Sequence, residues 1–330
     1  MKSTKIEKEV YTAKDGTDHI YYNQEGLCIR DVTLNLGIGE EIMIGHLSDI
    51  HFNYCNDEDF READPVVMST YEYREWNRDA ATVPKARSCF EFLDDADFFV
   101  INGDTMDYLS HGAAELTKKE VFEAHPNCIA TIGGHESAKR MQGKVDENTT
   151  LQERLEIVQS IWPHDIYYAS KLLKDKILVV GIYDNQAVCP EKVLENLKKD
   201  IAEAREKGYF ILLFAHEPFV TGNPKHTVVT EDDVLQAGDV SGFPKDFYRG
   251  LSRGNKMVGS DDCDDTTKEV YKTIITNADV IKGIFAGHFH NDMYMEIIAK
   301  TSDGEATVIP QYIHTATAYS KGHLMRIIIK

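Results

Sequence analysis

The stretch KARSCFEFLDDADFFVINGDTMD, residues 85–107, joins a helical pattern to a short apolar strand that ends in carboxylates. The first twelve residues carry apolar side chains at helical spacing, and residues 98–102 form a nearly continuous apolar run. The run stops at Gly103, and Asp104 and Asp107 follow directly. An apolar run of this kind is typical of a strand that is buried on both faces and covered by helices.

The same succession of helix and strand recurs along the chain and predicts an α/β fold. A helical pattern at residues 149–162 is followed by a strand-like run at 176–185, one at 191–208 by a run at 209–218, and one at 267–279 by a run at 280–290. The C-terminal part differs, because residues 292–300, 305–310 and 323–330 form consecutive strand-like segments without helices. We expect these last segments to form an antiparallel end of a sheet.

Composition limits the classes of protein to which the chain can belong. Its 330 residues are 42% hydrophobic and 28% charged, which is the balance of a folded globular protein. The formal net charge of −19 disfavours nucleic acid and anionic membrane surfaces as partners. No apolar run approaches the length of a membrane span, and the polar start MKSTKIEKEVYTAKDG has no apolar signal region. Six cysteines without a C-x-x-C pair suit a reducing compartment, so we expect a cytoplasmic protein.

The domain organisation is predicted to be simple. We find no internal repeat and no long linker, so residues 1–330 are expected to form one domain. Residues 1–44 contain short alternating segments broken by glycines, which indicates a β-rich entry. Residues 217–264 are punctuated by glycines directly after a strand and are typical of a lid or binding insert. A variable, solvated loop is the alternative for that segment.

Five of the predicted strands end in carboxylates or imidazoles. The residues that follow them are Asp49 and His51, Asp104 with Asp107, His135, His216, and finally His288 and His290. Because the carboxyl ends of strands in an open α/β sheet meet at one edge, these side chains should converge. Asp and His together suit first-row divalent metals. Each end alone has an ordinary explanation, such as a helix cap or a core histidine, but the set predicts a metal site.

The order of these motifs also resembles a known family. D-x-H, then G-D-x-x-D, then a G-N-H-[DE]-like element, then a lone His and G-H-x-H is similar to the signature of the calcineurin-like metallophosphoesterases, over roughly residues 43 to 291. The resemblance implies a four-layer fold of the α+β type, with two mixed β-sheets packed face to face and helices on the outer faces. It also implies hydrolysis of a phosphomonoester or phosphodiester at a site for two metal ions.

Carried over by position, the resemblance assigns a role to each motif residue. Asp49, His51 and His290 would hold the first ion, Asp104 would bridge both ions, and His216 and His288 would hold the second. Mn, Fe and Zn are the expected metals. The resemblance implies in-line attack by a metal-bound hydroxide, with His135 as the general acid and Asp107 orienting it.

The chain departs from the family pattern at one position. Where the family has G-N-H, this chain has Gly133, Gly134 and His135, so the Asn ligand of the second metal is missing. We therefore expect the second ion to bind more weakly than the first. The alternative to an enzyme is a metal-binding scaffold or regulatory protein of the same fold that has lost turnover through Gly134. A nuclease would share the chemistry, but the net charge of −19 and the absence of a basic stripe disfavour it.

Several weaker features carry no prediction of a site. Arg74, in STYEYREWNRDA, could contact a phosphate, although an amphipathic helix packed on the sheet is the default reading. His314 and Tyr312 fit a packed strand as well as a site. The expected partner is a small phosphate ester or a phosphoprotein.

Overall fold

A computed structural model describes most of the chain. The chain divides into two compact units. The first unit comprises residues 1–166 and 316–330, and the second comprises residues 167–315. Each unit contains one β-sheet and is described by itself. The described residues are 9–12, 18–24, 26–74, 79–138, 149–223, 257–290, 292–318 and 322–330.

The first unit is built on a mixed seven-stranded sheet with the order β1-β2-β3-β13-β4-β5-β6. The strands are β1 (Glu9–Thr12), β2 (Asp18–Gln24), β3 (Leu27–Leu34), β4 (Ile42–Leu47), β5 (Phe98–Asn102), β6 (Cys128–Thr131) and β13 (Gly322–Ile329). Strands β4, β5 and β6 are parallel neighbours. All five residues of β5 are buried, as the continuous apolar run predicts.

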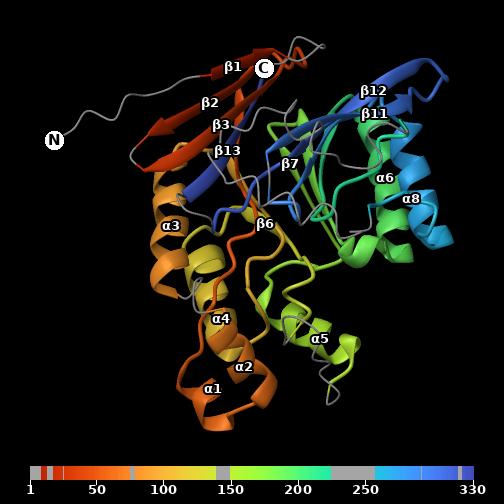
Figure 1. Ribbon diagram of the computed structural model, residues 1–330. Helices are drawn as coiled ribbons and strands as arrows, with labels where there is room; N and C mark the ends of the chain where they lie inside the picture. The colour runs from red at the N-terminus through yellow and green to blue at the C-terminus, as the bar shows by residue number, and fades with distance from the viewer. Residues whose placement is uncertain are drawn as a thin grey trace. The chain divides into compact units, whose positions relative to one another are not determined.

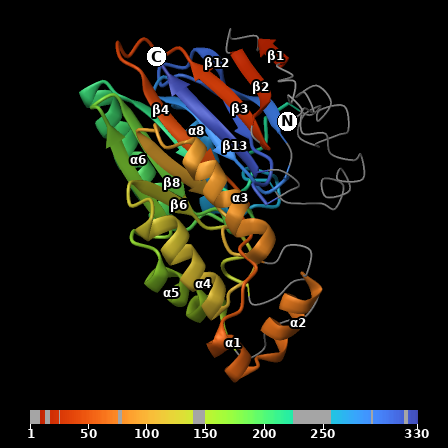
Figure 2. The same ribbon diagram turned by 90° about the vertical axis from the view of Figure 1, so that its left-hand side faces the viewer.

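The helices of the first unit follow the sequence patterns and their capping residues. They are α1 (Asp57–Glu62), α2 (Pro65–Tyr73), α3 (Asp79–Phe92), α4 (His111–Thr117), the π-helical turn η2 (Lys118–Glu123) and α5 (Leu151–Ile161). Helix α5 begins with a capping box between Thr150 and Glu153, and α1 begins with one between Asn56 and Asp59. Helix α3 runs along the sheet beside β13 (Figure 2).

The second unit contains a mixed six-stranded sheet with the order β11-β12-β10-β9-β8-β7. The strands are β7 (Tyr168–Leu173), β8 (Ile177–Ile182), β9 (Phe210–Phe214), β10 (Ile281–Ala286), β11 (Met293–Lys300) and β12 (Ala306–Ile313). The four central strands are parallel, and β7 and β11 pair antiparallel at the edges.

Two long helices, α6 (Glu191–Lys207) and α8 (Asp265–Ile275), lie side by side in the second unit (Figure 1). Helix α6 buries residues spaced three to four apart, namely Val193, Leu197, Ile201 and Ala204. It ends at Gly208, whose φ of 76° is the left-handed conformation that glycine adopts freely. The unit also contains one short 3-10 turn, η3 (Asn185–Ala187).

The predicted α/β fold with two mixed sheets and helices is confirmed. One expectation about the C-terminal strands was wrong. Strands β11 and β12 do form an antiparallel hairpin, but β13 joins the other sheet, where it pairs parallel with β3 and antiparallel with β4. Six of the eight residues of β13 are buried and the other two are half-buried, as expected of a strand that lies inside a sheet and is covered on both faces.

The predicted domain organisation stays a prediction. Most of the proposed lid, residues 224–256, lies outside the described residues. None of the described helices combines the length and the apolar character that crossing a membrane requires.

Candidate metal centre

Two parallel strands of the first unit bring their following residues to one edge of the sheet. Asp49 and His51 follow β4, and Asp104 follows β5. The backbone N–H of Asp49 donates to Gly103 O at 3.0 Å, and that of His51 donates to Asp104 O at 2.9 Å. All three residues have a positive φ, between 48° and 53°. Such a conformation is uncommon outside glycine and clusters at functional sites, where surrounding structure holds it.

These three residues form a buried set of metal-ligand type. Asp49 and His51 are fully buried and Asp104 is 2% exposed. One ligand atom from each lies within 4.8 Å of those of the others. Burial lowers the pKa of His51 to about 4, so its imidazole is neutral and has the lone pair that a metal needs. Two carboxylates and an imidazole are a donor set that fits a first-row divalent ion.

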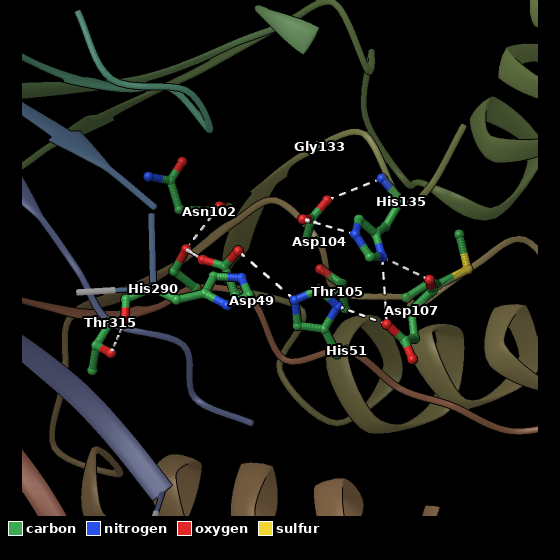
Figure 3. Close-up of polar contacts among 12 residues, drawn as sticks. Asp49, His51, Asn102, Asp104, Thr105, Asp107, Gly133, His135, His290 and Thr315 are labelled. Carbon is green, nitrogen blue, oxygen red and sulfur yellow. Dashed lines mark hydrogen bonds and ion pairs between the residues drawn. The ribbon is translucent and has the colours of Figure 1, made fainter. Parts of the chain in front are cut away.

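His135 lies against Asp107 in the same unit (Figure 3). The Nδ1 atom of His135 is 2.7 Å from the backbone carbonyl oxygen of Asp107 and 3.4 Å from its Oδ1. Its backbone N–H also donates to Asp104 Oδ1 at 3.0 Å. Burial alone would lower the pKa of His135, but the carboxylates of Asp104 and Asp107 outweigh it and raise the pKa to about 9. The His135 side chain is 22% exposed, so it remains accessible to a ligand.

Asp107 is shared by two imidazoles and an arginine. His51 Nδ1 is 3.0 Å from Asp107 Oδ1, and Arg74 reaches both carboxylate oxygens, with Nε 2.7 Å from Oδ2. Burial would raise the pKa of Asp107, but hydrogen bonds from His135, His51 and Arg74 hold it well below its usual range. Asp107 is therefore ionised at neutral pH. The sequence did not predict the contact with Arg74.

Glu136 is a second residue that the sequence did not single out. Its buried carboxylate accepts hydrogen bonds from the backbone N–H groups of Asp104 (3.1 Å), Thr105, Met106 (3.1 Å) and Gly133 (2.8 Å). It therefore ties the turn that carries Asp104 to the turn that carries His135. The available signal was the acidic position that ends the G-N-H-[DE]-like motif.

Gly134 lies in the turn between β6 and His135. Its carbonyl oxygen accepts a hydrogen bond from Ser137 Oγ at 3.2 Å. Gly134 is not one of the described glycines with a positive φ. A positive φ is therefore not the reason for glycine at this position, where the chain lacks the Asn of the family pattern.

The second unit brings its own histidines together at the ends of two parallel strands. His216 follows β9 and His288 follows β10, and their ring centroids are 5.2 Å apart. Ligand nitrogens of the two rings lie within 4.8 Å of each other. His288 and His290 have φ values of 64° and 56°, so these strand ends repeat the left-handed backbone seen in the first unit. The backbone carbonyl of His290 accepts from Thr315 Oγ1 at 2.7 Å.

Buried carboxyl groups hold the turn that carries His216. Asp184 accepts from the backbone N–H of His216 at 3.0 Å and of Glu217 at 2.8 Å. Glu217 in turn accepts from the backbone N–H of Gln186 at 2.6 Å. Burial raises the pKa of both carboxyl groups above their ordinary values. Neither residue was singled out from the sequence.

The predicted site residues thus fall into two sets. The first unit groups Asp49, His51, Asp104, Asp107 and His135 around the ends of β4, β5 and β6, and the second unit pairs His216 with His288. Both sets have the donor chemistry of metal ligands. Their union into one centre stays a prediction.

Comparison with known proteins identifies the class. The family model of the calcineurin-like phosphoesterases matches residues 42–292, which is well over half of the chain. The chain therefore belongs to the calcineurin-like phosphoesterase family. No curated protein matches it.

Three solved structures to which the chain is similar share little sequence with it. A dimetal phosphatase from Danio rerio is 10% identical, with a TM-score of 0.42 over 84% of this chain and 88% of that one. A purple acid phosphatase from yellow lupin (Lupinus luteus) seeds is 10% identical, with a TM-score of 0.40 over 94% and 49%. The NAD nucleotidase of Haemophilus influenzae is 11% identical, with a TM-score of 0.37 over 84% and 45%. The chain thus spans about half the length of the latter two proteins.

Proposed function

We propose that this protein is a metal-dependent phosphoesterase that hydrolyses a phosphomonoester or a phosphodiester. The observation that carries the proposal is the buried group of Asp49, His51 and Asp104, which lies beside the His135–Asp107 pair in a member of a phosphoesterase family. A metal-ligand set next to a positioned imidazole has the parts that hydrolysis of a phosphate ester needs.

The proposed ligands come from both units. Asp49, His51 and Asp104 of the first unit and His216, His288 and His290 of the second would hold two divalent ions, with Mn, Fe or Zn as the fitting metals. When bound, the ions would supply Lewis acidity toward the phosphate oxygens and lower the pKa of water. Asp104 is the proposed bridging ligand, because it falls at the motif position to which the family resemblance assigns that role.

His135 is the proposed general acid. Its Nδ1 lies 2.7 Å from the Asp107 carbonyl oxygen and 3.4 Å from Asp107 Oδ1, and the two contacts together orient the ring and leave Nε2 to give a proton to the leaving oxygen. The nearby carboxylates raise the pKa of His135 to about 9, so the ring is protonated at neutral pH.

The substrate class remains broad. A net charge of −19 favours a small phosphate ester or a phosphoprotein over nucleic acid or a membrane surface, since a long polyanion would be repelled. We also propose that the chain acts as one domain and that residues 217–264 form the lid over the site.

A second candidate function rests on Gly134. A metal-binding scaffold or regulatory protein would keep the fold and the first ion while turnover is lost with the missing amide ligand. The ionised Asp107 and the positioned His135 favour the enzyme, because a scaffold has no use for a general acid.

The experiment that separates the two candidates is a hydrolysis assay. Purified protein would be given an aryl phosphomonoester and an aryl phosphodiester with added Mn²⁺, Fe²⁺ or Zn²⁺, in parallel with the Asp104→Ala variant. The enzyme hypothesis expects metal-stimulated hydrolysis that the variant lacks. Metal binding without hydrolysis of either ester would favour the scaffold.

A further inference from the structure

Arg74 forms a buried, bidentate ion pair with Asp107, in which two guanidinium nitrogens form a fork on the carboxylate. Its Nε lies 2.7 Å from Oδ2 and its Nη2 lies 2.5 Å from Oδ1. The arginine side chain is 9% exposed and the aspartate side chain is fully buried. A planar guanidinium that binds both oxygens fixes the orientation of the carboxylate as well as its charge.

The orientation matters because one oxygen of Asp107 serves both imidazoles. Oδ1 is 3.0 Å from His51 Nδ1 and 3.4 Å from His135 Nδ1, and the two rings meet edge to face with centroids 4.6 Å apart. Rotation of the carboxylate about its Cβ–Cγ bond would break both contacts. The Arg74 fork opposes that rotation, since each of its nitrogens is bonded to a different oxygen.

Arg74 is itself held at its backbone. It forms the C-cap of α2, where its N–H donates to Thr70 O at 2.9 Å. Its carbonyl oxygen accepts from Asn53 Nδ2 at 2.6 Å, and Asn53 Oδ1 accepts from the hydroxyl of Tyr108 at 2.8 Å. Tyr108 follows Asp107 in the chain, so these bonds close a ring that joins the end of α2 to the turn carrying Asp107. A rigid anchor of this kind suits a residue that positions another.

We infer that Arg74 is a positioning residue for the proposed general acid: it holds the carboxylate of Asp107 in the orientation that aligns His135. The inference rests on the proposed function, because it assigns Arg74 a part in the same reaction. It differs from a phosphate contact, since the guanidinium acts through Asp107 and not on the substrate.

The test compares Arg74→Met with a matched control, Arg87→Met. Arg87 makes the same kind of fork on Glu120, with two bonds of 2.7 Å, and within the described part of the chain that carboxylate has no hydrogen bond or ion pair with a proposed site residue. Activity would be measured with a phosphate ester that has a poor alkyl leaving group and with a nitrophenyl ester. Arg74→Lys, which keeps the charge but loses the fork, covers the case in which Arg74→Met does not fold.

The expected result is selective. Arg74→Met should lower kcat for the alkyl ester by about 10–100-fold, the usual effect of disturbing a supporting contact, and leave KM unchanged. The nitrophenyl ester should lose less, because its leaving group departs without a proton. Adding Arg74→Met to His135→Ala should cost little more than His135→Ala alone. Arg74→Lys should lie between wild type and Arg74→Met, and Arg87→Met should match wild type. Equal losses on both esters, a raised KM, or additive effects would each overturn the inference.

A spectroscopic readout keeps this test separate from the proposed function. In Zn²⁺-supplied protein with ¹⁵N-labelled histidine, Arg74→Met should shift the ring-nitrogen resonance of His135, and Arg87→Met should not. The His135→Ala spectrum assigns the resonance. An unmoved His135 resonance in folded Arg74→Met or Arg74→Lys protein would contradict the positioning role even if neither ester is cleaved. If Arg74→Met shifts the His135 resonance as expected but the wild type hydrolyses neither ester, the positioning role stands and only the enzyme hypothesis is contradicted.

Discussion

The carboxylate of Glu136 lies directly beside the backbone of Asp104, and its Oε2 accepts the Asp104 N–H at 3.1 Å. The same carboxylate accepts from the backbone of Thr105, Met106 and Gly133. Asp104 has a φ of 48°, so its backbone is held in a conformation that most residues avoid. The Glu136 carboxylate therefore stabilises the turn that presents the proposed bridging ligand.

Replacing Glu136 should damage metal binding more than a comparable change elsewhere. In Glu136→Gln one acceptor oxygen becomes an NH₂ group that faces backbone N–H donors, so the Asp104 turn should shift. We expect metal affinity to fall by about 10–100-fold, as for other supporting residues. Asp59→Asn is the matched control, because Asp59 is also buried and accepts from the backbone N–H groups of Asn56, His111 and Gly112. Calorimetric metal titration of both variants checks the prediction, and equal losses of affinity would contradict it.

Removal of the proposed acid should depend on the leaving group. His135→Ala should lower kcat by about 10²–10⁴-fold for an ester with a poor leaving group, and less for a nitrophenyl ester. Steady-state rates with both esters provide the measurement. The same loss on both would mean that His135 acts through binding or positioning of the substrate.

Restoring an amide at position 134 should strengthen the second metal site. Because the backbone of Gly134 is not in the left-handed region, Gly134→Asn should fold without the strain of a positive φ. We expect the later of two metal-binding events in a calorimetric titration to tighten in Gly134→Asn. Gly134→Ala is the control, since it adds a side chain without an oxygen ligand. Two indistinguishable tight sites in the wild type would show that another group has replaced the missing Asn.

His164 should make the first unit less stable in mild acid. Its Nδ1 donates to Asp165 O at 3.1 Å and its Nε2 accepts the Ala130 N–H at 3.0 Å, so the ring must be neutral to make both bonds. Burial lowers the pKa of His164, while the unfolded chain keeps a pKa of about 6.5. The unfolded state therefore binds the proton more readily. The stabilising contribution of the neutral His164 ring is present above about pH 6.5 and is lost as the pH falls through the lowered pKa.

Urea unfolding of wild type and His164→Gln tests this effect. Glutamine keeps an acceptor near the position of Nε2 but does not titrate. The stability of the wild type relative to the variant should fall between about pH 7.5 and about pH 5.5, by at most about 1–3 kcal/mol for an unpaired buried N–H. His111→Gln, at an exposed histidine, is the control. A difference that is the same at both pH values would rule out the role of His164.

The parts of the site that the sequence predicted are those next to strand ends. Asp104 follows an apolar run that is buried on both faces, and such runs place the next residues at the edge of a sheet. His216 and His288 follow parallel neighbours in the same way and do lie together. The hydrophobic periodicity and the order of the strands were thus enough to predict that these residues lie at the ends of parallel strands.

The supporting contacts could not be predicted because they join distant segments. Arg74 meets Asp107 across 33 positions, and whether the end of α2 reaches that turn depends on packing that no local pattern encodes. Asp184 likewise contacts the backbone of His216, 32 positions away. The prediction for β13 was wrong for a related reason, since the order of strands along the sequence does not determine which sheet each strand joins.

The central claim is that residues of both units hold the metal ions that hydrolysis requires, and bound metal is its most direct measure. Metal per chain would be determined by elemental analysis after loading and desalting, for wild type, Asp104→Ala in the first unit and His216→Ala in the second. A two-metal site predicts about two ions per wild-type chain, nearly complete loss in Asp104→Ala and loss of about one ion in His216→Ala, each with loss of hydrolysis. Full metal content in both variants, or wild-type hydrolysis that persists after chelation, would contradict the account.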